Sequence, residues 1–268
     1  MINLRKYGQA PFNVAVIHGG PGAPGEMAPV ARELSPHFGV LEPIQTAASL
    51  EGQLQELYAV LDRNGDLPLT LIGWSWGAWL SFIFSAHYPL MVKKLIIVGS
   101  GPFEEKYATN IMKTRLSRLT EKERAEVQSI MRTFNDPSIK DKNSLFHRFG
   151  KLLTKADTYD PLTLDTDVLE TQFDIHQSVW KEAVEFRKNG ELLRLGEKIQ
   201  CPVVAIHGNH DPHPHEGVKI PLSLILREFR FILLRNCGHH PWLERDARSR
   251  FYDILRKELH FNKYTKEQ

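Results

Sequence analysis

A single serine stands between two tryptophans and two glycines in residues 73–77 (GWSWG). The apolar run 69–72 precedes it and a helix-like run follows, so Ser75 is expected on a sharp strand-to-helix turn. Glycines two residues away on either side let the strand and the helix pack closely, and this G-x-S-x-G pattern is typical of a nucleophile elbow. A serine that only helps a tight turn is the alternative interpretation.

A base and an acid for this serine follow later in the chain. A serine hydroxyl is a strong nucleophile only when a base removes its proton, and that base works best when a carboxylate orients it. Enzymes with a nucleophile elbow supply these partners in the order serine, acid, histidine. Asp211 follows the apolar run 202–206 and His239 follows the run 230–234. We therefore predict a catalytic triad of Ser75, Asp211 and His239.

Other residues compete for the roles of acid and base. Glu104 and Glu105, just past the apolar run that ends near residue 98, are alternative acids. Two adjacent histidines, His239 and His240, cannot both point into the site in the same manner. We prefer His239 because it directly follows a glycine, which leaves His240 to contact the next helix, expected to begin at Pro241.

Acyl transfer also needs hydrogen-bond donors for the oxyanion. The backbone N–H of Trp76, the residue after the serine, is one predicted donor. The glycine-rich segment 18–22 (HGGPG) follows the first apolar run, and we assign the second donor to the N–H of Gly20. This segment lacks the spacing of a phosphate-binding loop. Trp74 and Trp242 are candidates for the border of the substrate pocket, because they lie beside these residues in sequence; the alternative is that they belong to the core.

Short apolar runs alternate with helical patterns along most of the chain. Runs bounded by glycine, proline or charge are typical of buried parallel strands, and their alternation with helices predicts a mostly parallel, doubly wound α/β sheet. One helix is expected after Ser49, a suitable N-cap. The short N-terminus leaves little room for a strand before the first of the six runs, which are residues 13–17, 39–41, 69–72, 94–98, 202–206 and 230–234.

Residues 103–198 interrupt this alternation with charged, helical sequence. No convincing strand is found there, and residues 120–123 (TEKE) form a capping box that predicts a helix carrying Val127, Ile130 and Met131. We predict that this segment is a helical cap inserted between two parts of the core, 1–102 and 199–268. There it would cover the carboxyl ends of the strands, where open α/β sheets bind ligands.

Composition narrows the class of protein. The chain has 268 residues, 42% of them apolar and 25% charged, as expected for a soluble globular protein with a large core. A formal net charge of +2 without a basic block argues against a nucleic-acid partner. We expect no membrane partner and a cytoplasmic location, because no run reaches the roughly 18 apolar residues of a membrane span and no signal peptide is recognised. Cys201 and Cys237 form no metal-type pair and are expected to be buried.

The HGGPG and GWSWG segments, together with Asp211 and His239, resemble the α/β-hydrolase superfamily over essentially the whole chain outside residues 103–198. Within that superfamily, HGGPG and the Ser-Trp-Gly of the elbow resemble the proline iminopeptidase branch, whose members cleave N-terminal residues from peptides beneath a helical cap. The resemblance implies a serine hydrolase that acts on a small molecule or a short peptide. The triad mechanism itself needs no cofactor.

The chain departs from that branch in two places. Residues 41–48 (LEPIQTAA) stand where an Asp-x-Arg-Gly-x-Gly-x-Ser segment is usual. The cap has residues 180–182 (WKE) without the paired tryptophan of the usual Trp-x-x-Trp-Glu pattern. Glu182, Glu185 and Asp174 are the candidate cap residues for holding a substrate amino group.

Other classes of function stay open at this stage. The histidine-rich segment 207–215 (HGNHDPHPH) would suit zinc or iron. Its spacing matches no standard hydrolase motif, however, and its prolines stiffen it as a loop. Because a fold does not fix a function, a non-catalytic binding protein and a carbon–carbon hydrolase are further alternatives. The prediction is an ester or amide hydrolase without a metal. The candidate metal ligands in this segment are His207, His210, Asp211, His213 and His215.

Overall fold

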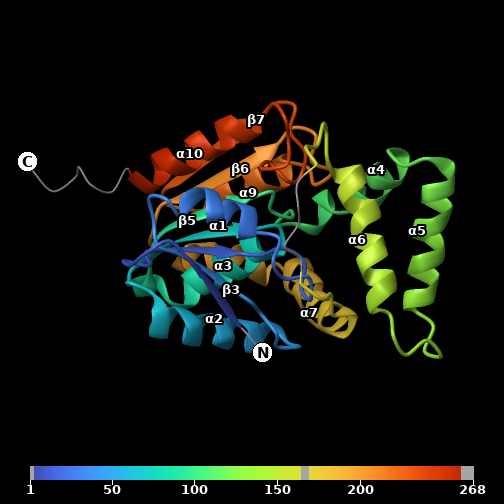
Figure 1. Cartoon of the computed structure of the whole chain (residues 1–268), viewed down its shortest axis with the longest axis horizontal. Helices are drawn as coiled ribbons and strands as arrows, with labels where there is room; N and C mark the ends of the chain where they lie inside the picture. Colours follow the sequence, from blue (N-terminus) through green and yellow to red (C-terminus); the bar gives the residue numbers. More distant parts are fainter. Residues whose placement is uncertain (1–2, 164–168, 261–268) are drawn as a thin grey trace, which may run out of the picture.

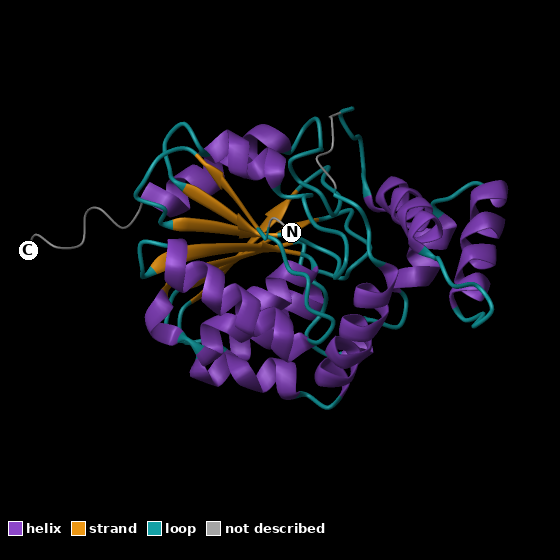
Figure 2. Ribbon diagram, turned by 60° about the horizontal axis from the view of Figure 1, so that its bottom comes forward, coloured by secondary structure: helices purple, strands orange, loops and turns teal. Residues whose placement is uncertain are grey.

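One seven-stranded sheet forms the centre of the molecule, with helices on both faces (Figures 1 and 2). The computed structural model describes residues 3–163 and 169–260. Every neighbouring pair in the order β1-β3-β2-β4-β5-β6-β7 is parallel except β1–β3, so the predicted doubly wound sheet is confirmed. The strands are β1 (Leu4–Tyr7), β2 (Val14–Ile17), β3 (Val40–Pro43), β4 (Leu69–Trp74), β5 (Val92–Val98), β6 (Val203–Gly208) and β7 (Phe229–Leu234).

The expectation that the N-terminus leaves little room for a strand before the first apolar run was wrong. Strand β1 pairs antiparallel with β3, with Leu4 opposite Pro43 and Tyr7 opposite Val40. Three of its residues are partly buried and Lys6 is exposed, because β1 lies at the edge of the sheet. Residues 4–7 (LRKY) contain no continuous apolar run, which is why the sequence pattern did not reveal this strand.

Two apolar layers, one on each face of the sheet, hold the strands in place. Parallel strands with helices on both sides are buried on both faces, and β2, β4 and β6 are buried along their full length. Ser49 caps its helix as predicted, because its Oγ accepts the N–H of Gly52 at 3.1 Å. One layer contains α2 (Leu50–Asn64), α3 (Trp76–His87) and α9 (Glu216–Ile225), and the other contains α1 (Ala28–Leu34) and α10 (Arg248–His260).

The last helix begins later than predicted. Pro241 lies in a turn, and α10 starts at Arg248. Between them, Glu244 forms an isolated antiparallel bridge with Pro161, and its carboxylate accepts backbone N–H groups of the neighbouring segments. This tertiary pairing fixes the backbone after Pro241 in a non-helical form, which helix propensity does not register.

Helices account for the regular structure between residues 103 and 198, where the described part contains no strand. The capping box at Thr120 is confirmed, since Thr120 and Glu123 bind each other's backbone N–H groups. Val127 and Ile130 are buried as expected, while Met131 is exposed. Figure 2 shows two of these helices projecting beyond the sheet. The main helices are α4 (Ile111–Ser117), α5 (Glu121–Phe134), α6 (Asn143–Asp157), α7 (Phe173–Lys188) and α8 (Glu191–Arg194).

Neither a disulfide nor a membrane helix is found in residues 3–163 and 169–260. Both cysteines are free; Cys237 is buried and Cys201 is half-buried. Burial raises the pKa of the Cys201 thiol to about 11, so it carries little thiolate at neutral pH. No helix in this part of the chain is both long and apolar enough to cross a bilayer.

Candidate active site

Ser75 lies on a tight turn between β4 and α3. Its backbone has φ +53° and ψ −115°, a conformation that is strained for a residue with a side chain. A Cβ atom at Gly73 would lie 2.2 Å from the Gly77 oxygen, and one at Gly77 would lie 2.3 Å from the Ile17 oxygen. Both glycines are therefore required by the close contact of strand and helix, as the elbow pattern predicts.

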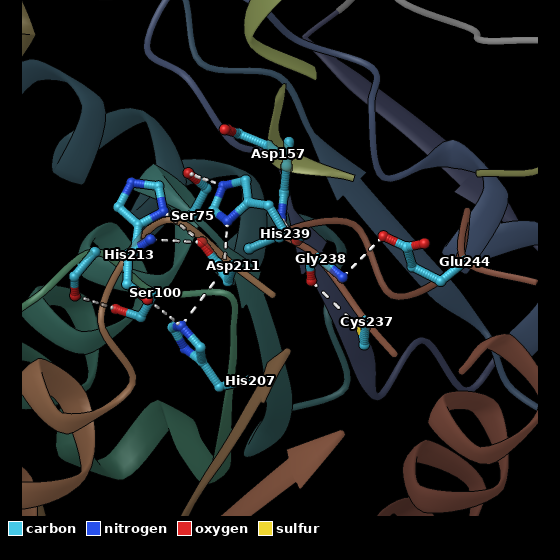
Figure 3. Close-up of polar contacts among 12 residues, drawn as sticks. Ser75, Ser100, Asp157, His207, Asp211, His213, Cys237, Gly238, His239 and Glu244 are labelled. Atoms are coloured by element: carbon cyan, nitrogen blue, oxygen red, sulfur yellow. Dashed lines mark hydrogen bonds and ion pairs between the residues drawn. The ribbon is translucent and has the colours of Figure 1, made fainter. Parts of the chain in front are cut away.

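Three side chains from separate loops form a hydrogen-bonded chain at this turn (Figure 3). His239, after β7, lies with its Nε2 3.0 Å from Ser75 Oγ and its Nδ1 2.7 Å from Oδ2 of Asp211, which follows β6. A carboxylate only accepts hydrogen bonds, so His239 donates Nδ1–H to Asp211. The lone pair of Nε2 then faces the serine hydroxyl, which is the arrangement that proton removal requires.

The surroundings of Asp211 and His239 favour a charged carboxylate and a basic imidazole. Burial alone would raise the pKa of Asp211, but the surrounding imidazoles of His239, His213 and His207 hold it well below its ordinary value. Burial lowers the pKa of His239, and the Asp211 carboxylate with its hydrogen bond more than offsets this, so the net pKa is raised. Opposite charges thus outweigh desolvation at both positions.

A glycine at the end of β5 makes room for the acid–histidine contact. Gly99 has φ +51°, and a Cβ atom there would lie 2.9 Å from the His239 backbone oxygen and 3.1 Å from its Nδ1. On the other side, Trp74 Nε1 donates to the same oxygen at 2.8 Å. Residues at the ends of two neighbouring strands, β4 and β5, therefore contact His239.

Gly20 and Trp76, the predicted oxyanion donors, both line the cavity that contains Ser75. Gly20 has φ +34°, and Trp76 is the first residue of α3, where N–H groups have no partner inside the helix. In residues 3–163 and 169–260, neither N–H has a recorded hydrogen bond. His18 fixes the loop before Gly20, because its Nδ1–H donates to the Gly19 oxygen at 2.7 Å and its Nε2 accepts the Gln45 N–H at 3.4 Å.

The histidine loop is also held by the segment that follows α6. The backbone oxygen of Asp157 accepts the backbone N–H of His239 at 2.8 Å, and Glu244 Oε1 accepts the backbone N–H of Gly238 at 2.8 Å. Glu244 also accepts the N–H groups of Tyr159 and Asp160, each at 2.8 Å. Sequence reasoning missed these contacts, because they join segments that are far apart in the chain and no motif marks them.

A buried ion pair lies beside the triad. Arg115 on α4 binds both carboxylate oxygens of Asp157, with contacts of 2.8 Å from Nε and 2.6 Å from the terminal nitrogen. Burial would raise the pKa of Asp157, but the guanidinium holds it below the ordinary value. The positive charge of Arg115 therefore neutralises the negative charge of Asp157, and this pair adds no net charge to the site.

A cavity of about 540 Å³ opens over Ser75 between the loops of the core and the helices of the cap. Trp79 from α3 and Trp180 from α7 face each other across a ring distance of 5.8 Å, with their planes 3° apart. Both rings line the cavity. The helices α4, α5 and α6 add an apolar wall made by Ile111, Met112, Phe134, Phe146, Phe149 and Leu153.

Only one of the two tryptophans predicted for the pocket is found there. Trp74 lines the cavity, whereas Trp242 is 2% exposed and packs against Trp74 and Phe251 in the core, so that prediction was wrong. His240 does not contact the start of a helix either. Its ring packs against Trp74 and Trp242, and the residue lines the cavity.

The acidic cap residues do not line the cavity. Glu182 accepts the N–H of Leu50 at 2.7 Å, and neither Asp174 nor Glu185 is among the lining residues, so the structure does not support their proposed role. Only Glu26, on the loop after HGGPG, brings a carboxyl group into the cavity without a recorded ion pair in the described part of the chain. Burial raises its pKa to about 7.

The histidine-rich segment does not come together as one group. His210 contacts the Tyr159 ring and His215 lies against Phe231, whereas His207 and His213 approach Asp211 to 3.5 and 2.8 Å. Ligand-type atoms of Asp211, His213 and His239 lie within 4.8 Å of one another. Both imidazole Nδ1–H groups donate to the carboxylate, so this is a hydrogen-bonded cluster rather than a set of lone pairs directed at a common point.

The competing acids are used elsewhere. Glu104 binds Lys106 at 3.0 Å and Glu105 binds Arg187 at 2.8 Å. His87, another histidine near the elbow in sequence, is exposed at the end of α3. Asp211 is the carboxylate that binds His239.

Comparison with known proteins agrees with this architecture. A family model described as the alpha/beta hydrolase fold matches residues 13–246. The chain belongs to this family, whose members are generally hydrolytic enzymes. No curated protein matches the sequence.

Solved structures with the same fold have low sequence identity to this chain. VinJ is 18% identical with a TM-score of 0.65, covering 96% of this chain and 93% of VinJ. A proline iminopeptidase from Mycobacterium smegmatis is 19% identical with a TM-score of 0.61, covering 96% and 94%. An enol-lactonase from Burkholderia xenovorans LB400 is 16% identical with a TM-score of 0.61, covering 96% and 95%. At such identities the likeness concerns the fold alone.

Proposed function

We propose that this protein is a serine hydrolase that cleaves an ester or amide bond of a small substrate through an acyl-enzyme intermediate. The observation that carries the proposal is the chain of hydrogen bonds from Ser75 through His239 to Asp211, with lengths of 3.0 and 2.7 Å. The strained serine turn and the unpaired N–H groups beside it support the same conclusion.

In the acylation step, His239 Nε2 takes the proton of Ser75 as Oγ attacks the substrate carbonyl. The backbone N–H groups of Gly20 and Trp76 hold the oxygen that becomes negative, and the positive end of α3 adds to this stabilisation. His239 then gives its proton to the leaving group. Asp211 stays ionised and stabilises the imidazolium while it exists.

In the deacylation step, a water molecule replaces the leaving group. His239 takes a proton from this water, which attacks the acyl carbonyl, and the same two N–H groups stabilise the second tetrahedral intermediate. Collapse of this intermediate releases the acid and returns the proton to Ser75 Oγ. All steps use groups of the protein and water.

The wall of the cavity supports an apolar acyl group as the bound part of the substrate. Most side chains of α4, α5 and α6 that line the cavity are apolar; the polar ones are Thr154 and the Arg115–Asp157 pair, which is internally compensated. Apolar walls with a few fixed polar groups are typical of sites for small ligands. We therefore expect medium-length aliphatic or aromatic acyl groups.

An aminopeptidase like proline iminopeptidase is the second candidate, and Glu26 is the observation that favours it. Glu26 lines the cavity without an ion pair in the described part of the chain, and its carboxyl group would bind a substrate amine. The similarity of fold to the Mycobacterium smegmatis enzyme is consistent with this activity. Cleavage of aminoacyl-naphthylamides would separate the two candidates.

The test compares wild type with Ser75→Ala on two panels of substrates, p-nitrophenyl esters of rising acyl length and aminoacyl-naphthylamides that include proline. Cleavage of esters that disappears in Ser75→Ala supports the hydrolase proposal, and serine-dependent cleavage of the prolyl amide selects the aminopeptidase. A fluorophosphonate probe should label Ser75 in the wild type. Activity that survives in Ser75→Ala would contradict the assignment.

Ser129→Ala provides a matched control. Ser129 lies on the exposed face of α5, outside the cavity. It is expected to keep wild-type rates on both panels and wild-type labelling, which separates loss of the nucleophile from a general effect of removing a serine hydroxyl. Sensitivity to chelators with no probe labelling would instead support a metalloenzyme, and silence in every assay would support a binding protein.

A further inference from the structure

The Asp211 carboxylate binds two imidazoles (Figure 3). Oδ2 accepts Nδ1–H of His239 at 2.7 Å, and Oδ1 accepts Nδ1–H of His213 at 2.8 Å. The backbone N–H of His213 binds the same Oδ1 at 2.9 Å. The mechanism above uses only the contact at Oδ2, so the second imidazole has no role in it.

The second imidazole is fixed by its surroundings. The rings of His213 and His239 lie with their centroids 4.6 Å apart and their planes at 34°. His207 on β6 donates its Nε2–H to the His213 backbone oxygen at 2.9 Å. Residue 213 is therefore held at both its side chain and its backbone, in an orientation that keeps a donor on the far oxygen of Asp211.

The two imidazoles differ in basicity. Burial lowers the pKa of His213 to about 4, while the pKa of His239 is raised. Two positive rings at this separation would repel each other, so protonation of His239 during the reaction keeps His213 neutral. His213 thus stays a neutral donor whose N–H is committed to the carboxylate.

We propose that His213 is a positioning residue, which holds the Asp211 carboxylate with Oδ2 toward His239 and limits the basicity of that histidine. A carboxylate with donors on both oxygens cannot rotate without losing hydrogen bonds. Each donor also stabilises its charge, so Asp211 raises the proton affinity of His239 less than a carboxylate without the second imidazole would. The inference rests on the proposed serine hydrolase function.

Other charged or titratable groups face this cluster from neighbouring elements. His207 Nε2 lies 3.5 Å from Asp211 Oδ2, and the Arg115–Asp157 pair approaches from the cap. In the described part of the chain, only His213 has a recorded hydrogen bond to Asp211 Oδ1, so a change of its side chain alters that contact selectively. The facing groups are His207, Arg115, Arg118, Asp157, His240 and Glu26.

The first experiment compares His213→Leu with His213→Asn. Leucine removes the side-chain donor, whereas the asparagine amide nitrogen can occupy the place of Nδ1 and still donate to Asp211. The readout is the rate of fluorophosphonate labelling of Ser75 between pH 5 and 9, which requires no knowledge of the natural substrate. His215→Leu is the matched control, because His215 lies in the same loop and contacts Phe231 instead of Asp211.

We expect His213→Leu to slow labelling about 10- to 100-fold at neutral pH, the size expected for a lost hydrogen bond to a charged group. The acid limb of the pH profile should move up by about 0.5 to 1 pH unit, because the pKa of His239 rises. His213→Asn should stay within about threefold of wild type with its acid limb unmoved. An unshifted limb in the folded leucine variant, or an asparagine variant as slow as leucine, would overturn the proposal.

A second measurement does not depend on catalysis or on the folding of the leucine variant. In proton NMR spectra at low temperature, imidazole N–H groups bound to a buried carboxylate give separate low-field resonances. Wild type should show two that are lost in Asp211→Asn, and His213→Asn should lose one of them. A single such resonance in wild type contradicts the role of His213. Absence of Ser75 labelling in wild type contradicts the proposed function instead, while the two resonances still report the cluster.

Discussion

The two halves of the cavity are built on different principles. The core half consists of polar groups on loops at strand ends, and nearly every one is fixed by a hydrogen bond, as Asp211 and His239 show. The cap half presents mainly apolar side chains on helices, such as Phe146 and Leu153. Under the proposed function, this difference assigns bond cleavage to the geometry set by the sheet, and the choice of substrate to the volume left by the cap.

The halves are nevertheless joined by several hydrogen bonds. Asp157, at the end of α6, binds the backbone of His239, and Gln172, before α7, donates its N–H to the Gly22 oxygen at 2.7 Å. His176 also binds the oxygen of Pro21, with its Nδ1 at 3.2 Å. The cap therefore contacts both the loop that carries His239 and the glycine-rich loop of residues 18–22.

The largest expected effect comes from the core half. Asp211→Asn should lower kcat about 10⁴-fold, because the amide can donate to His239 Nδ1 and favours the wrong tautomer. Relative rates on esters of different acyl length should not change, since the cap is untouched. Asp174→Asn, an exposed change on α7, is the control and should have wild-type kcat. A changed acyl preference in Asp211→Asn would break the division between the halves.

Loss of the Arg115–Asp157 pair should have the next largest effect, on stability. Arg115→Met leaves a buried carboxylate without its partner and should lower the free energy of unfolding by about 3 to 5 kcal/mol, measured in urea. The double variant Arg115→Met/Asp157→Leu should recover most of this loss. Arg148→Met, which breaks the exposed pair with Glu126, should change stability little. A small loss in Arg115→Met would show that the cap contributes less to the fold than its contacts indicate.

A change in the apolar wall should alter substrate preference alone. Leu153→Trp reduces the volume of the cavity and should lower kcat/KM for long acyl esters about 10- to 100-fold, with acetyl ester cleavage unchanged. Leu153→Ala enlarges the same place and should shift the preference toward longer groups. If both variants instead lowered cleavage of all esters equally, the wall would be affecting the triad rather than the fit of the substrate.

The pH dependence of wild type sharpens the description of the core half. Only neutral His239 can take the serine proton, so kcat/KM should fall about tenfold per pH unit below the pKa of this group. Because that pKa is raised, the midpoint of the acid limb should lie above the ordinary value of about 6.5. The pH profile of kcat/KM on one activated ester measures it, and a midpoint well below 6.5 would contradict the Asp211 contact.

The smallest expected effect is a gain in stability within the cap. Gly150 lies inside α6, and a Cβ atom there meets no other atom within 4 Å. Gly150→Ala should raise the free energy of unfolding by about 0.5 to 1 kcal/mol, because alanine loses less backbone entropy in a helix. Denaturant unfolding measures the gain, and kcat should be unchanged. A loss of stability would show that α6 needs the freedom of glycine at this position.

Much of the fold was predictable because local patterns report local physics. Six apolar runs coincide with six strands, and Ser49 and Thr120 cap helices as predicted, since N-cap preferences act within one turn. The edge strand β1 and the late start of α10 were missed. Both depend on pairing with distant segments, β3 and Pro161, which no window of sequence contains.

The candidate site divides in the same way. Sequence by itself determined which residues can do chemistry: a serine flanked by glycines, then an acid and a histidine placed after strands in the required order. Tertiary structure decided which neighbours complete the site. It moved Trp242 into the core, brought Trp79, Trp180 and Glu26 into the cavity and placed His213 on the second oxygen of the acid. Motifs record chemistry that needs fixed spacing, whereas contacts between loops depend on how the whole chain packs.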